Sequence, residues 1–228
     1  MLSDDGCGIA ARVDDPRLTD PALEIALAWQ PRRSRPALGV LLALDQRLAA
    51  MVSRSREPVL AQIRLAWWRE QLGQGSMQNR GGEPLLAEIE RYWGADAGRL
   101  VPLVDGWENL LGERPMASED IEAFAAGRGE ALGAFAELAG ESTERAAATV
   151  AGRTWALSEF ATPSSDPDER ASALMLAANT RFILPRSRAL RGLSVLGGLA
   201  NRALQAGQPL LHDRRAVLTA IRLGMLGR

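Results

Sequence analysis

Apolar residues recur at intervals of three and four along almost the whole chain, the spacing that places side chains on one face of an α-helix. The alternation of apolar and polar residues that is typical of half-buried strands is absent. Acid-Pro pairs, glycine-rich runs and capping residues divide the pattern into helical segments. The predicted helices cover residues 20–30, 36–54, 58–74, 84–94, 97–112, 118–139, 142–161, 167–181, 186–206 and 213–226.

These segments predict an all-α fold, a single-domain helical bundle of about ten helices. The bundle is expected over residues 17–228, after a loose N-terminal tail at 1–16. The gaps between helices are too short for a domain linker, and no internal repeat indicates a solenoid. With 228 residues, 46% of them hydrophobic, the chain can bury one sizeable core.

Composition excludes several kinds of chemistry. The net charge of −1 gives no overall field that would attract nucleic acid. All 27 basic residues are arginine, which excludes a Schiff-base lysine and a P-loop lysine. One cysteine, Cys7, and one histidine, His212, make a disulfide, a zinc site or a His-containing triad improbable. We expect a cytoplasmic protein without a transmembrane segment, for which peripheral membrane contact stays open.

The helix at 58–74 carries a charged residue between two apolar flanks. Arg64 and Gln71 fall in the gap between these flanks, and Trp68 lies one turn from Arg64, where its indole can stack on the guanidinium. The alternative is that the stem of Arg64 follows the edge of the bundle and its charge stays in water. Three other tryptophans have no chemical context in the sequence and are expected to serve packing alone: Trp29, Trp93 and Trp107.

Three further charges fall on apolar helix faces. Asp45, Arg128 and Arg153 each lie among the hydrophobic residues of their own helices. Unpaired buried charge is costly, so these groups are expected to be paired or to face a wet cavity. Three inward arginines against one aspartate predict a positively charged interior suited to an anionic head on an apolar tail. An internal ion pair between Asp45 and Arg64 is the alternative.

Several short motifs follow one another along the chain: Glu57-Pro58, Ile63 to Glu70, Phe124 to Gly127, Ala151 to Leu157, Leu184-Pro185 and Leu226 to Arg228. Together they resemble the squalene/phytoene synthase family, from about residue 20 onward. The resemblance implies an isoprenoid-synthase fold, in which helices surround a central cavity. Active members of the family join two prenyl diphosphates head to head.

Active members of that family hold Mg²⁺ against a diphosphate with two aspartate-rich motifs on helices. Here the positions of the first motif carry Ala49, Ala50 and Ser53. The second is expected within 163–167, where the sequence is Pro-Ser-Ser-Asp-Pro. No metal ligands and no cofactor are therefore expected; Mg²⁺ would be a cofactor only if the chain were an active transferase.

Three functions remain open at this point. The first is a non-catalytic family member that binds a prenyl diphosphate or another anionic lipid-like ligand through Asp45, Arg64, Trp68, Gln71, Arg128 and Arg153. By analogy with a family member needed for assembly of respiratory complex I, such a protein could also have a protein partner. The second is an active head-to-head prenyltransferase. The third is a purely structural helical protein whose inward charges are ion pairs.

Overall fold

The computed structural model describes all residues except 1–17, 19, 55–56, 75–81 and 228. The predicted N-terminal tail at 1–16, which includes Cys7, lies outside the described residues. Within the described part the fold is all-helical, without strands. Its elements are α1 (Pro21–Trp29), α2 (Arg35–Arg54), α3 (Pro58–Gly73), α4 (Pro84–Trp93), η1 (Gly94–Leu100), α5 (Val101–Asn109), α6 (Ser118–Leu138), η2 (Ser142–Glu144), α7 (Arg145–Ala161), α8 (Pro167–Asn179), η3 (Arg188–Leu190), α9 (Arg191–Ala206) and α10 (Arg214–Leu226).

The predicted all-α bundle of about ten helices is confirmed, and each predicted segment corresponds to an α-helix of the structure. The main difference is at 97–112, which divides into the 3₁₀ helix η1 and the α-helix α5. Pro102 lies at the start of α5 and has no N–H to donate to the preceding turn, so an α-helix cannot run through this point without a lost hydrogen bond.

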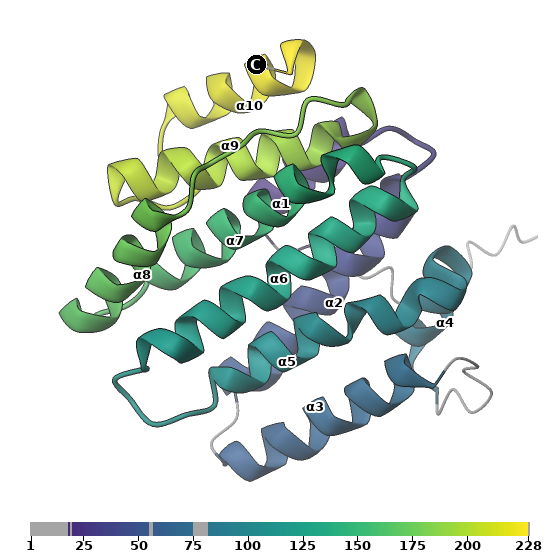
Figure 1. Ribbon diagram of the computed structural model, residues 1–228, viewed down its shortest axis with the longest axis vertical. Helices are drawn as coiled ribbons and strands as arrows, with labels where there is room; N and C mark the ends of the chain where they lie inside the picture. Colours follow the sequence, from purple (N-terminus) through teal and green to yellow (C-terminus); the bar gives the residue numbers. More distant parts are fainter. Residues whose placement is uncertain (1–17, 19, 55–56, 75–81, 228) are drawn as a thin grey trace, which may run out of the picture.

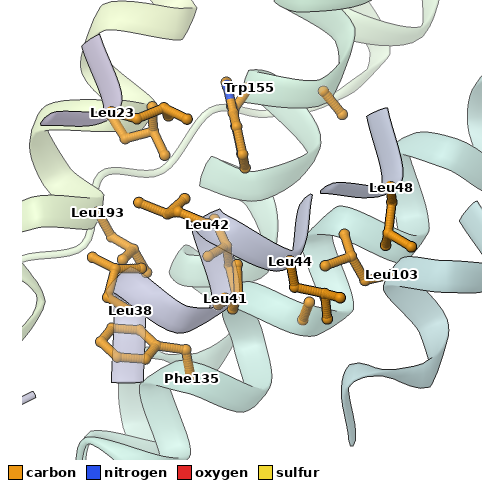
Figure 2. Packing of buried hydrophobic residues seen from close by; sticks show 14 of the residues in the cluster. Leu23, Leu38, Leu41, Leu42, Leu44, Leu48, Leu103, Phe135, Trp155 and Leu193 are labelled. Carbon is orange, nitrogen blue, oxygen red and sulfur yellow. The ribbon is translucent and has the colours of Figure 1, made fainter. Parts of the chain in front are cut away.

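The helices form one compact arrangement in which α6 and α7 run side by side across the middle (Figure 1). α5 and then α3 lie on one side of this pair, and α9 and then α10 lie on the other. α3 and α10 therefore form opposite edges of the bundle. Figure 2 shows the core around α2, where leucines of that helix pack against residues of α1, α5, α6, α7 and α9: Leu38, Leu41, Leu42, Leu44 and Leu48 against Leu23, Leu103, Phe135, Trp155 and Leu193.

Glycines allow the central helices to approach one another closely. A Cβ atom at Gly127 of α6 would lie 2.2 Å from the carbonyl oxygen of Pro102 in α5. A Cβ atom at Gly152 of α7 would lie 2.8 Å from the carbonyl oxygen of Arg128 in α6. Neither contact leaves room for a side chain. These two glycines therefore allow α5 and α7 to pack closely against α6 near Arg128.

α2 is the one helix in the described part of the chain that is long and apolar enough to cross a membrane by composition, over Arg35–Ser53. Half of this segment is buried (50%), and α1, α3, α4, α5 and α6 pack against the helix. This is the environment of a core helix in a folded bundle, so α2 provides no clear transmembrane segment.

The two apolar flanks predicted for α3 have different environments. Ala61, Leu65, Trp68 and Leu72 are buried, but the second flank is open to solvent because α3 packs against the bundle along one side only. Arg64 is exposed with this second flank, so its predicted inward orientation is wrong. The exposed apolar residues are Val59, Leu60, Ile63 and Trp67.

Candidate functional site

Arg128 is buried near the middle of α6 and binds two carboxylates from other helices. Its Nε and Nη2 donate to Oδ1 and Oδ2 of Asp45 in α2, at 2.8 and 2.7 Å. Its Nη1 donates to Oε2 of Glu159 in α7, at 2.7 Å. The side chains of Arg128 and Asp45 are each 2% exposed, whereas that of Glu159 is 29% exposed. One guanidinium therefore joins three helices, and only its Glu159 partner reaches solvent.

Aromatic rings surround this guanidinium. Its Cζ lies 3.9 Å from the ring centroid of Trp155, 4.9 Å from that of Phe124 and 5.1 Å from that of Trp107. The indole of Trp107 also donates to Oδ1 of Asp45, at 2.8 Å. The role of packing alone that the sequence assigned to Trp107 is therefore wrong, because this indole holds the Asp45 carboxylate.

The electrostatic environment affects Arg128 and Glu159 in different ways. Burial alone lowers the pKa of Arg128, but the charges of Asp45 and Glu159 outweigh burial and raise it, so the group stays charged. Burial raises the pKa of Glu159; Arg128 lowers it, Asp45 raises it, and the net shift is upward. Glu159 is therefore the proton-accepting member of the network.

Two adjoining cavities meet at this network. The first, which we call the polar cavity, has a volume of about 290 Å³, and the second, the apolar cavity, about 580 Å³. Because the two share part of their walls, we call the shared region the junction. The residues that line both cavities are Ala49, Ser53, Trp107, Arg128 and Glu159.

The polar cavity has an excess of carboxyl groups. Asp20, Asp45 and Glu159 line it, against the single guanidinium of Arg128. The indole of Trp155 is part of the same wall. The prediction of a positively charged interior is therefore wrong. Two of the three arginines expected there lie elsewhere, and the charge of the third is neutralised by carboxylates.

The apolar cavity has mainly hydrocarbon walls. Arg114 reaches it from the segment after α5, with a side chain that is 62% exposed. Nη1 of Arg114 donates to both oxygens of Glu169 at 2.8 Å, and its Cζ lies 5.9 Å from the ring centroid of Phe160. The apolar part of the lining comes from Val52, Pro58, Leu110, Leu111, Phe124, Phe160 and Pro163.

The residues predicted to bind a ligand do not come together as one site. Asp45 and Arg128 lie in the cavity wall, as a pair that excludes the predicted Asp45–Arg64 pair. Trp68 is 1% exposed and belongs to the core, and Gln71 follows it on α3, away from both cavities.

Arg153 was expected to point inward, and this orientation is also wrong. Its stem crosses Gly129 of α6, and its Nη2 donates to Oε1 of Glu122 at 2.5 Å. The side chain is 21% exposed and lines neither cavity. The apolar neighbours of Arg153 in sequence predict an inward side chain. The sequence of α7 alone does not show that a glycine of the adjacent helix leaves room for the arginine stem to pass out of the core.

Glu159 and Trp155 are the functional candidates that sequence reasoning missed. They lie one turn apart on α7, on the side of the helix that faces Arg128. The signal in the sequence was a single acidic residue between Leu157 and Phe160, in a helix whose other buried positions are apolar or small.

The chain matches no family model, and no similar curated protein or solved structure was found. No group of three or more His, Cys, Asp or Glu side chains suited to a metal ion occurs among the residues that the structure describes. The two cavities and the network between them are therefore the features of this chain that indicate a function.

Proposed function

We propose that this chain is a binding protein of the squalene/phytoene synthase type that lacks Mg²⁺-dependent prenyl transfer and holds an amphiphile in its central cavities. The tail of the ligand lies in the apolar cavity, and its polar head lies at the junction, against Arg128 and Glu159. The observation that carries the proposal is an apolar cavity of about 580 Å³ that ends on a buried charged network.

Size and wall chemistry support an apolar tail. Cavities that bind small molecules typically enclose about 300 to 1,000 Å³ and combine apolar walls with a few polar groups that fix orientation. The apolar cavity lies within this range, and among the described residues its charged lining consists of Arg114, Arg128 and Glu159. A chain of carbon atoms can contact the aliphatic and aromatic walls while the polar end reaches the network.

The raised pKa of Glu159, together with its place at the junction, supports a head that is anionic or accepts a hydrogen bond. With Glu159 ionised, its charge and that of Asp45 exceed the charge of Arg128 by one unit. With Glu159 protonated the three groups balance, and its carboxyl group becomes a donor. Because an anion beside Glu159 raises the pKa of that carboxyl further, binding takes up a proton and strengthens as the pH falls.

The residues at the expected metal positions support binding without prenyl transfer. Ala49, Ala50 and Ser53 line the polar cavity, so the side chains at the first motif reach the site but bring methyl groups and a hydroxyl. Pro163 and Ser164, from the region of the second motif, line the apolar cavity. Of the three carboxylates that line the polar cavity, Asp45 and Glu159 are bonded to Arg128, and Asp20 caps α1 by accepting from the backbone N–H of Ala22.

The test is a titration of the purified chain with farnesyl diphosphate, followed by tryptophan fluorescence, with and without Mg²⁺. We expect saturable binding that tightens at mildly acidic pH and exceeds that of farnesol, which has the same tail and a neutral head. Ala49→Phe fills the junction and should weaken binding roughly tenfold or more. The matched control Ala66→Phe, on the exposed face of α3, should bind like the parent chain.

Two outcomes would overturn the proposal. Release of pyrophosphate that depends on Mg²⁺ would show an active transferase. Absence of saturable binding, or binding that Ala49→Phe leaves unchanged, would favour a structural helical protein whose buried charges serve only to fix the packing.

A further inference from the structure

α10 is an outer helix with an apolar face turned away from the bundle. Its inner face packs on α9 and α1, where Leu223 lies against Gly198 and Gly224 lies against the indole of Trp29. Its outer face bears large apolar side chains that are 42–67% exposed, which we call the α10 stripe: Val217, Leu218, Ile221, Met225 and Leu226.

All charged residues within α10 are basic. Arg214, Arg215 and Arg222 are exposed and border the α10 stripe, and the helix contains no acidic residue. None of the three has a carboxylate partner in the part of the chain that the structure describes. Asp213, the capping residue at the start of the helix, is already engaged by Arg202 and by the backbone N–H of Ala216.

A fourth arginine lies near the other end of the helix. Arg191, the first residue of α9, places its guanidinium against Gly227, directly after α10. The preceding turn, η3, carries the exposed Arg188. Arg191 itself is buried, so the exposed basic groups of this region are the three arginines of α10 and Arg188 on the neighbouring turn.

We propose that α10 docks on an anionic lipid bilayer, lying in the plane of the membrane surface. A helix with an apolar stripe bordered by arginines fits a bilayer because headgroup charge and hydrocarbon lie in adjacent layers of one surface. The sequence did not indicate this surface, since arginines are spread along the whole chain and the exposure of α10 becomes evident only when the bundle is assembled.

Charge disfavours a second copy of the chain as the occupant. An α10-to-α10 contact would bring six like charges together around an apolar seam, without a carboxylate to offset them. The exposed apolar flank of α3 is similar in size to the α10 stripe but differs in charge, because the acidic Glu70 as well as the basic Arg64 is exposed beside it. This flank therefore serves as the comparison surface in the test below.

The test is co-sedimentation of the full chain with vesicles of phosphatidylcholine alone and of phosphatidylcholine mixed with phosphatidylglycerol. We expect binding to the mixed vesicles that weakens with salt, and little binding to the neutral ones. Each arginine near an anionic surface contributes roughly fivefold to affinity, so the triple variant Arg214→Gln, Arg215→Gln, Arg222→Gln should lose roughly a hundredfold.

A pair of double variants separates α10 from other apolar surface. Leu218→Ser with Ile221→Ser should abolish most vesicle binding, whereas Val59→Ser with Ile63→Ser on α3 should not change it. All four residues are exposed, so circular dichroism should show unchanged folding for both variants. Equal binding to neutral and mixed vesicles, equal loss in the α3 control, or no binding by the full chain would overturn the proposal. So would a dimer in size-exclusion chromatography that the α10 variant dissociates.

Discussion

Arg128 donates two hydrogen bonds to the carboxylate of Asp45, of 2.8 and 2.7 Å, although the two residues are 83 positions apart in the chain. Both side chains are 2% exposed, so the pair lies in a low-dielectric environment where either charge alone would be very costly. The pair fixes α2 against α6, and through Glu159 it also fixes α7. Its geometry therefore sets both the register of the central helices and the wall of the cavities.

Removing one partner of this pair should destabilise the fold strongly. In Asp45→Asn, the buried guanidinium keeps only Glu159 as a charged partner, and the indole of Trp107 loses its charged acceptor. We expect the free energy of unfolding to fall by about 3 kcal/mol, measured by urea denaturation.

The control for Asp45→Asn is Glu130→Gln, which breaks an ion pair of the surface. Glu130 binds Arg145, with side-chain exposures of 46% and 37%. A loss of at most about 1 kcal/mol is expected there. If the two variants lost equal stability, the buried pair would contribute no more than a solvated one, and its proposed part in fixing the register would fail.

Glu159 should make stability fall as the pH rises above the ordinary range of a glutamate. Its pKa is raised above 4.5 by burial, so between 4.5 and the raised value the folded state holds a proton that the unfolded state has released. In that window the unfolded state binds fewer protons, and the free energy of unfolding decreases with increasing pH. Glu159→Gln cannot titrate and should remove this slope.

Denaturation curves across that pH window test the prediction. Glu130→Gln serves again as the control and should retain the slope of the parent chain. A slope that persists unchanged in Glu159→Gln would mean that another group carries the proton, and the role of Glu159 at the junction would be lost with it.

Helix periodicity was enough to predict the fold, because nearly all segments bury one wide apolar face and begin or end at clear signals. Asp20-Pro21, Glu57-Pro58 and Glu83-Pro84 each precede the first turn of a helix as predicted. The same periodicity placed Asp45 and Arg128 inside the bundle, since both lie at the centre of a wide apolar arc.

The remaining site residues could not be predicted from single helices. Arg64 lies between two apolar flanks, but α3 is at the edge of the bundle and buries only one of them, a fact that depends on which helices surround it. The partners of Arg128 come from α2 and α7, and no pattern within α6 identifies them. Whether a charge is paired is a property of the packed helices, so the net charge of the cavity could not be counted in advance.

Glu169 should stabilise the wall of the apolar cavity, and its contribution should disappear in acid. Its carboxylate is 3% exposed and accepts from Arg114, from Ser164 and from the backbone N–H of Met116. Burial alone raises the pKa of Glu169, but these hydrogen bonds outweigh burial and lower it below 4.5. The stabilisation is therefore present above pH 4.5 and is lost as the pH falls through the lowered pKa.

In Glu169→Gln we expect a loss of about 2 kcal/mol at neutral pH that shrinks as the pH is lowered. Asp168→Asn, an exposed substitution in the same turn of α8, should change stability by at most about 0.5 kcal/mol. Urea denaturation at several pH values measures both. A loss in Glu169→Gln that stays constant into acid would show that the side chain acts through packing and that its charge is irrelevant.

The close approach of α5 and α6 should make Gly127 intolerant of any side chain. A methyl group there would lie 2.2 Å from the carbonyl oxygen of Pro102, which is backbone and cannot rotate away. Gly127→Ala must therefore separate the two helices. We expect the free energy of unfolding to fall by about 2 kcal/mol or more, with a weaker contact between Trp107 and Asp45.

Gly39→Ala in α2 is the matched control, because its nearest neighbour is Leu27 at an ordinary 3.5 Å. There the better helix propensity of alanine should add about 0.5 to 1 kcal/mol. Thermal unfolding of the two variants should shift in opposite directions, and a shift in the same direction would show that α5 and α6 have room to adjust.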